Sequence, residues 1–306
     1  MDNRYLQIVR ENILIPVIIV AIIIFSVLQP PFLSPNNLFA VLKQMSVLAI
    51  VSVGICIIII TGEIDLSFAA VLGFCPLVTV LLLPYTGDIV AVVVALMTGL
   101  GIGYVNGVFT TKVGVPSFIV TLGMMGLLTG LTNFITRYQA LGVRSVFLID
   151  LFGGQVGPLS MPVIWMIIVL LFAYALTRLR YGKRIYATGG DERAARYSGI
   201  ETKKIKILAF VIMGGLAALG GLIEMGRMEA VRPGMGDYYF LLGLTAPILG
   251  GTSLSGGIGT IKGTVLSVLL LILLASGLNM LGFDPAARLI AQGIILVLAV
   301  VLRGRT

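Results

Sequence analysis

The sequence predicts an all-α polytopic membrane protein, and three observations support this prediction. Of the 306 residues, 58% are hydrophobic and only 11% are charged, whereas charged residues make up about a quarter of an ordinary soluble domain. The mean hydropathy is +1.09. One long charged stretch, residues 178–206, interrupts the apolar runs. The chain contains no histidine, the commonest general base and a frequent zinc ligand, so we expect neither an enzyme nor a metal site.

Ten stretches approach the length of about 20 apolar residues that a helix needs to cross a bilayer. In chain order they are Ile13 to Leu28, Leu38 to Ile60, Leu66 to Pro84, Ile89 to Thr110, Ser117 to Thr136, Met161 to Thr177, Ile207 to Met225, a short Tyr239 to Gly250, Gly263 to Leu281 and Ala286 to Leu302. We interpret the first as a retained anchor, because Gln29-Pro30-Pro31 ends it without a small-x-small cleavage site. Asn37 is placed to cap the second. The polar residues 137–160 are expected to lie across one membrane surface.

Lysine and arginine predict the orientation, because short cytoplasmic loops collect them. With ten spans and both termini in the cytoplasm, fifteen of the 21 basic residues fall on the inner side. They are Arg4, Arg10, Lys112, nine residues of the stretch 178–206, Lys262, Arg303 and Arg305. The net charge of +8 therefore follows membrane topology and does not indicate nucleic acid. Residues 178–206 are expected to form a cytoplasmic loop.

A short helix is predicted inside this loop, from Asp191 to Tyr197. Acidic residues stand at its positive N-terminal end and arginines toward its other end, two alanines propagate it, and Gly199 stops it. We expect such a helix on a cytoplasmic loop to contact another protein. The narrower core, Gly189 to Gly199, is the segment for which we expect this role.

Two carboxylates, Glu63 and Asp65, stand in the sequence TGEIDLS between two apolar runs. A carboxylate in lipid costs several kcal/mol, so each must face water, a partner group or a helix end. In one interpretation Asp65 caps the third span and Glu63 lies in the interface. In the other, Glu63, Asp65 and Ser67 form a gate at the inner mouth of a pathway.

The glycine-rich stretch LGGTSLSGGIGTIKG, residues 249–263, does not match a P-loop, because no GxxxxGK[ST] register exists there. The chain is therefore not expected to hydrolyse ATP. Thr252 and Ser253 either belong to a tight turn or take part in gating. Elsewhere, Gly99, Gly103 and Gly107 are spaced for close helix packing.

Polar residues within spans are usually satisfied by hydrogen bonds between helices. Among them, Asn106, Asn133 and Asn279 are candidates for a solute pathway. Glu224 is expected to pair with Arg227 one turn further on. On the outer surface, the candidates for contact with a solute-binding protein are Arg144, Arg227, Arg232 and Asp237.

Four separated motifs together resemble one family. GEIDLSFAAVLGF, VPSFIVTLGMMGLLTG, YGKRIYATGGDERAARYSGIETKKIKI and LGGTSLSGGIGTIKGT, in this order and spacing, are similar to permease subunits of bacterial ABC importers for sugars of the ribose, xylose and galactose type. The resemblance covers nearly the whole chain, from Asn36 to Val301.

The resemblance implies a single transmembrane permease domain over residues 1–306, with the fold of a type II importer, in the bacterial inner membrane. It implies a second permease in a homo- or heterodimer, two ATP-binding cassette ATPase subunits, a solute-binding protein and surrounding lipids as partners. The ATPases would use ATP and Mg, and this chain would bind no cofactor. The resemblance also implies a coupling helix in this chain that docks on the ATPase. It would comprise Gly189, Gly190, Asp191, Glu192, Arg193, Ala194, Ala195, Arg196 and Gly199.

Two departures from the family pattern bear on the solute. Residues 239–242 read Tyr-Phe-Leu-Leu where the ribose permeases usually carry a Tyr-Glu-Leu-Asp stretch, and Glu63 stands where a small residue is common. These changes suggest a different solute, a different partner surface or a heterodimer. The alternative function is an ion-coupled secondary transporter. It is weakened because we find no isolated carboxylate at mid-bilayer depth.

Overall fold

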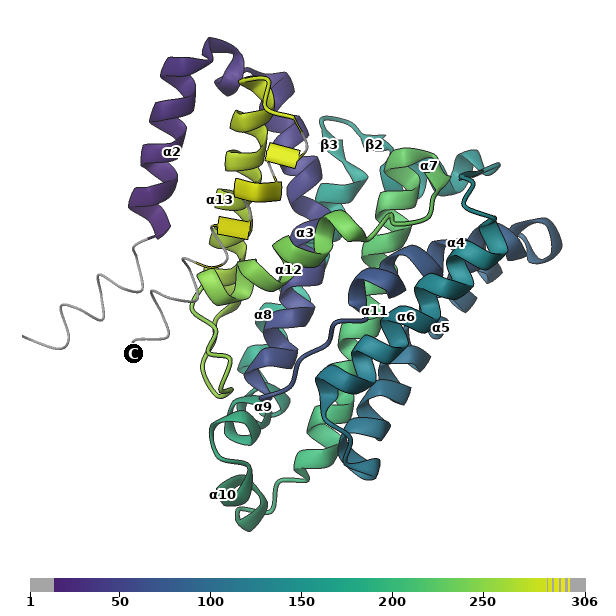
Figure 1. Cartoon of the computed structure of the whole chain (residues 1–306), viewed down its shortest axis with the longest axis vertical. Helices are drawn as coiled ribbons and strands as arrows, with labels where there is room; N and C mark the ends of the chain where they lie inside the picture. The colour runs from purple at the N-terminus through teal and green to yellow at the C-terminus, as the bar shows by residue number, and fades with distance from the viewer. Residues whose placement is uncertain (1–13, 285, 288, 292, 295–296, 298–306) are drawn as a thin grey trace, which may run out of the picture.

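The computed structural model describes residues 14–284, 286–287, 289–291, 293–294 and 297. Its helical elements are α2 (Leu14–Leu28), η1 (Pro30–Leu33), α3 (Pro35–Ile60), α4 (Phe68–Thr86), α5 (Asp88–Val108), η2 (Phe109–Val113), α6 (Ser117–Thr136), α7 (Val146–Gly153), α8 (Met161–Arg178), α9 (Arg180–Gly190), α10 (Glu192–Tyr197), α11 (Thr202–Met228), α12 (Asp237–Leu249) and α13 (Ile261–Met280). Four two-residue strands, β1 (Leu141–Gly142), β2 (Gln155–Val156), β3 (Leu159–Ser160) and β4 (Ala230–Val231), form two small antiparallel ladders. The described part of the chain is mainly a bundle of helices (Figure 1).

Seven helices of the described residues are long and apolar enough to cross a membrane. They are Pro35–Ile60, Phe68–Thr86, Asp88–Val113, Ser117–Thr136, Met161–Arg178, Thr202–Met228 and Ile261–Met280. They confirm seven of the predicted spans. The first predicted span corresponds to α2, which has 15 residues from Leu14 to Leu28. Ile13, where the predicted span starts, lies outside the described residues. The last, Ala286 to Leu302, lies largely outside them.

The short eighth span is observed as α12, which has only 13 residues. At 1.5 Å per residue it is about 20 Å long, less than the roughly 30 Å hydrocarbon core of a bilayer. Pro247 lies near its end, and the glycine-rich stretch follows directly. The helix therefore does not cross a membrane by itself.

Helix α3 occupies the centre of the bundle, with other helices on either side of it in Figure 1. Every residue from Met45 to Ile60 is buried, as expected for a helix that is apolar on all sides. Ser34 caps this helix by accepting the N–H of Asn37. The prediction that Asn37 is the cap was therefore wrong, because Pro35 already starts the helix and the Asn37 side chain bonds elsewhere.

The predicted close packing of small residues is confirmed between α5 and α11. A Cβ atom on Gly103 would lie 2.2 Å from the carbonyl oxygen of Phe210, and one on Gly99 would lie 2.5 Å from that of Gly214. Gly107 similarly meets the backbone of Ile207. These glycines let the two helix backbones touch.

The end of the molecule that carries α9 and α10 is called the basic end below. At the opposite end, β1 pairs with β4, with Leu141 facing Val231. In the stretch 137–160, helix α7 buries Leu148 and Phe152 and approaches α11 so closely that Gly153 meets the backbone of Gly226. This stretch is thus part of the packed structure. Its placement across a membrane surface stays a prediction.

Candidate functional site

Helix α10 is held at its start and exposed along its outer face. The Asp191 carboxylate accepts the backbone N–H groups of Arg193 and Ala194, both at 2.9 Å, and so caps the helix. Gly199 follows with a φ of 79°, a conformation that favours glycine. Ala195 is buried against the bundle, whereas Tyr197 is 93% exposed. The predicted helix is confirmed, and its tip is a free surface in this chain.

An ion network ties α10 to the loop between α3 and α4. The ammonium group of Lys206 lies 2.7 Å from Glu63 Oε1 and 2.8 Å from Glu192 Oε2, and the side chains of Lys206 and Glu63 are only 13% and 14% exposed. Glu192 also accepts hydrogen bonds from Arg196 and Thr202. Burial alone would raise the pKa of Glu192, but the hydrogen bonds from Lys206 and Arg196 outweigh burial and lower it to about 2.

Lys206 was not among the predicted site residues, because it is one of nine basic residues in a loop whose charge the membrane topology already explained. Its partner Glu63 is 143 residues away in the chain. The one available signal was Glu63 itself, a carboxylate where the resembled family usually has a small residue. Such a group needs a counter-ion.

Three glycine-containing motifs meet beside this network. The N–H of Gly257 donates to the carbonyl of Ile60 at 2.9 Å, and a Cβ atom on Gly189 would lie only 1.7 Å from the same oxygen. The Tyr186 hydroxyl donates to Gly259 O at 2.8 Å. We call residues 60–63, 186–192, 206 and 256–259 the junction. It joins the end of α3, the start of the α10 segment and the turn before α13.

Thr252 and Ser253 belong to the turn next to the junction. Thr252 is buried, with its hydroxyl 3.4 Å from Cys56 Sγ. The Ser253 N–H donates to Ile258 O, and its carbonyl accepts from Gly256. These contacts match the tight-turn interpretation, and the gating role is untested.

Asp65, Ser67 and Asn106 form a buried cluster at the basic end. Asp65 Oδ1 accepts from the Ser67 N–H at 2.7 Å and from its hydroxyl at 2.6 Å. Asn106 Nδ2 on α5 donates to Ser67 Oγ at 2.9 Å, and Ile64 N–H donates to Ser117 of α6. Burial raises the pKa of Asp65 to about 6. The cluster fixes the loop directly before α4, which begins at Phe68 with Ser67 as its N-cap residue. Asp65 is thus not the cap that was predicted: its carboxylate binds the cap residue two positions further on, and the gate interpretation is untested.

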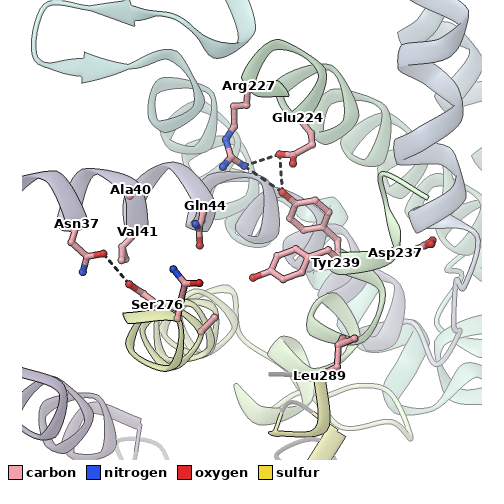
Figure 2. A pocket seen from close by; sticks show the side chains of 13 residues that line it. Asn37, Ala40, Val41, Gln44, Glu224, Arg227, Asp237, Tyr239, Ser276 and Leu289 are labelled. Atoms are coloured by element: carbon pink, nitrogen blue, oxygen red, sulfur yellow. Dashed lines mark hydrogen bonds and ion pairs between the residues drawn. The ribbon is translucent and has the colours of Figure 1, made fainter. Parts of the chain in front are cut away.

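At the other end of α3 the structure contains a cavity of about 640 Å³, which we call the polar pocket (Figure 2). Its lining comes from α3, α11, α12 and α13 and from Leu289: Asn37, Ala40, Val41, Gln44, Glu224, Arg227, Asp237, Tyr238, Tyr239, Ala275, Ser276, Asn279 and Leu289. Asn37 and Ile60, 23 residues apart on α3, are about 35 Å apart along its axis. The pocket and the junction therefore lie near opposite ends of one helix.

The polar pocket contains the predicted pair of Glu224 and Arg227. Arg227 lies 2.6 Å from Glu224 Oε2, and the Tyr239 hydroxyl donates to the same oxygen at 2.8 Å. Across the cavity, Ser276 donates to Asn37 Oδ1 at 2.9 Å. Figure 2 shows these two hydrogen-bonded groups on different sides of the space. Asn279 also lines this pocket.

The remaining candidates lie apart from both sites. Asn133 is half-buried on α6. Arg144 lines a second cavity, which also includes Asp88, and Arg232 is exposed just after β4. The ladder of β1 and β4 brings the segments that carry Arg144 and Arg232 together.

The family model described as "Branched-chain amino acid transport system / permease component" matches residues 37–300. The chain belongs to this permease family. The ribose import permease protein of Escherichia coli K12 is 40% identical over 289 residues, which cover 92% of this chain and 90% of that protein. The ribose import permease protein of Bacillus subtilis strain 168 is 34% identical over 92% of this chain and 89% of the relative. The D-allose transport system permease protein of E. coli K12 is 32% identical, over 94% and 89%.

No solved structure matches the chain. As a member of the permease family with seven apolar helices of spanning length, the protein is a multi-pass inner-membrane subunit of an ABC importer and not an enzyme. The predicted resemblance is confirmed.

Proposed function

We propose that this permease carries a monosaccharide, or a small polyhydroxy compound like one, inward across the bacterial inner membrane. The relatives named for ribose, D-allose and L-arabinose support a sugar as the solute. The departure from the ribose permease pattern at residues 239–242 leaves the individual sugar unassigned. A solute-binding protein delivers it, and a second permease completes the pathway.

The proposed topology has ten crossings and both termini in the cytoplasm, with the basic end inside. Helix α12 is too short to make the eighth crossing alone, and the glycine-rich stretch after it, which reaches Ile60 at the basic end, completes that crossing. The positive-inside distribution of lysine and arginine supports this orientation. The polar pocket and the segments around Arg144, Arg232 and Asp237 then face the outer side, where a solute-binding protein docks.

In this proposal α10 is the contact with an ATP-binding cassette ATPase, and the observation that carries the proposal is its geometry. The helix is capped by Asp191, its outer face is exposed, and its base is joined to the rest of the chain by Lys206 and Gly189. The partner binds ATP and Mg, and this chain binds neither.

ATP-driven closure of two ATPases would move α10 as a small rigid body. Lys206 passes this motion to the loop that contains Glu63, and Gly189 passes it to the end of α3. The loop also contains Asp65 and Ser67, whose hydrogen bonds continue to Asn106 on α5. Motion at the ATPase is thereby distributed to helices α3, α4 and α5.

Tyr197 provides the test of this coupling, since exposed aromatic residues are frequent anchors of protein interfaces. We expect Tyr197→Ala to reduce both ATPase co-purification and sugar uptake by cells or proteoliposomes. Tyr85, 85% exposed at the end of α4 opposite α10, is the matched control, and Tyr85→Ala should change neither. Equal ATPase association in both variants would contradict the docking role. Uptake driven by a proton gradient without any ATPase would instead support the ion-coupled alternative.

A further inference from the structure

The polar pocket has a composition that packing between membrane helices does not explain. Gln44 and Asn279 are exposed amides on helices of spanning length, and within the described part of the chain neither side chain has a hydrogen-bond partner. An amide that faces lipid without a partner is costly. Here both line the cavity instead, so their donors and acceptors are available to water or to a ligand.

We propose that the polar pocket is a binding site for one neutral, monosaccharide-sized polyhydroxy compound within this single subunit. This inference rests on the proposed function, because it names the place where the transported class of solute is held. The cavity of about 640 Å³ falls within the range of roughly 300–1,000 Å³ for small-molecule sites.

The charges of the pocket favour a neutral ligand. Arg227 and Glu224 neutralise one another at 2.6 Å, and the Tyr239 hydroxyl strengthens the pair. Asp237 is a further carboxylate in the lining, and its negative charge disfavours an anionic ligand. No unpaired cation lines this pocket among the described residues. An amino-acid zwitterion or a phosphate ester would bring an anionic group without a free counter-charge to receive it.

Hydroxyl groups match the hydrogen-bonding atoms that remain. Within the described residues both side-chain contacts of Glu224 use Oε2, which leaves Oε1 as an acceptor for a ligand hydroxyl. The amides of Gln44 and Asn279 can each donate and accept, as neighbouring sugar hydroxyls require. Apolar side chains between the polar ones supply contact for the C–H faces of a sugar ring: Ala40, Val41, Ala275 and Leu289.

Two hydrogen-bonded groups are preorganised on different sides of the cavity (Figure 2). Ser276 and Asn37 are bonded to each other, and Asn37 Nδ2 also donates to Phe32 O at 2.7 Å. Together with the Glu224, Arg227 and Tyr239 group, they form the fixed walls in Figure 2, while the unpaired Gln44 and Asn279 supply the adaptable contacts. Fixed walls reduce the ordering cost of binding.

The test uses the full-length permease in lipid nanodiscs without ATPase or binding protein. Saturation-transfer NMR measures binding of D-ribose, D-allose and L-arabinose, with L-leucine as the amino-acid probe. We expect transfer to at least one sugar and none to leucine. Gln44→Leu and Asn279→Leu should each lower the affinity for the sugar by about fivefold, the size expected for one lost hydrogen bond. Asn279→Gln, which keeps the amide, should retain part of the affinity.

Asn133→Leu is the matched control, because it removes a half-buried membrane amide on α6 outside the pocket. It should leave sugar binding unchanged, and size-exclusion chromatography verifies that every variant is folded. Absence of transfer to all three sugars, equal binding of leucine, or an equal loss in Asn133→Leu would overturn the inference. Sugar uptake by the assembled transporter is measured separately. If uptake persists while pocket binding fails, the proposed function stands and only this site is wrong.

Discussion

At the basic end Gly189 lies so close to Ile60 that no Cβ atom fits between them, whereas near the other end of the same helix α3 a cavity of about 640 Å³ opens beside Gln44. The ion pairs at the two ends also differ, in how far apart in the sequence their partners lie. Lys206 joins segments from distant parts of the chain, while Arg227 pairs with Glu224 only one turn away. The junction is suited to transmitting movement, and the polar pocket is suited to holding a ligand.

The largest expected effect comes from filling the junction. Gly189→Ala would place a Cβ atom against the Ile60 carbonyl, and overpacking against backbone is expected to cost about 3 kcal/mol or more. Thermal unfolding in detergent and sugar uptake should both fall. Gly190→Ala is the control, since a Cβ there meets nothing within 4 Å. If the two variants behave alike, tight contact is not what distinguishes this end.

A smaller loss is expected when the ion network of the junction is broken. Lys206→Met leaves Glu63 and Glu192 without their shared cation and should cost about 2 kcal/mol, less than the value for a fully buried pair. Lys204→Met removes an exposed pair with Glu201, whose side chains are 76% and 66% exposed, and should cost about 0.5 kcal/mol or less. Chemical unfolding measures the loss in the free energy of unfolding for both variants. Equal losses would mean that the network does not hold α10 in place.

The smallest effect concerns Asp65 and tests whether the buried cluster of Asp65, Ser67 and Asn106 excludes water. Its pKa is raised from 3.8 to about 6 by burial, so the folded protein binds the proton more tightly than the unfolded chain. The resulting stabilisation is complete below pH 3.8 and is lost as pH rises through about 6. The melting temperature should therefore be about 3 °C higher at pH 5 than at pH 7.5 from this group.

Asp65→Asn removes the titrating group and keeps an oxygen that accepts the Ser67 N–H. The part of the pH dependence that Asp65 causes should disappear in this variant. A melting temperature that depends on pH in the same way in both proteins would show that Asp65 is hydrated and that the cluster with Asn106 is open to water.

The sequence predicted the helices better than it predicted the sites. Helix α10 was placed from Asp191 and Gly199 alone, because caps and stop residues act within a few positions of the chain. The pairing of Glu224 with Arg227 was predicted for the same reason. Thr252 and Ser253 were candidates for a turn or for gating and Asn279 for a solute pathway, and they lie at two separate places. Nothing in their spacing distinguished a turn from a cavity.

The sequence by itself determined that this protein crosses a membrane many times and carries one short helix outside it, because a span must satisfy its own backbone hydrogen bonds and therefore appears as a continuous apolar run. Only the tertiary structure decided that Gly189 must be glycine, that Glu63 meets Lys206 and that four helices enclose the polar pocket. These features depend on how the helices pack. Packing brings together residues that are far apart in the sequence and follow no regular spacing, so no sequence pattern indicates their contact.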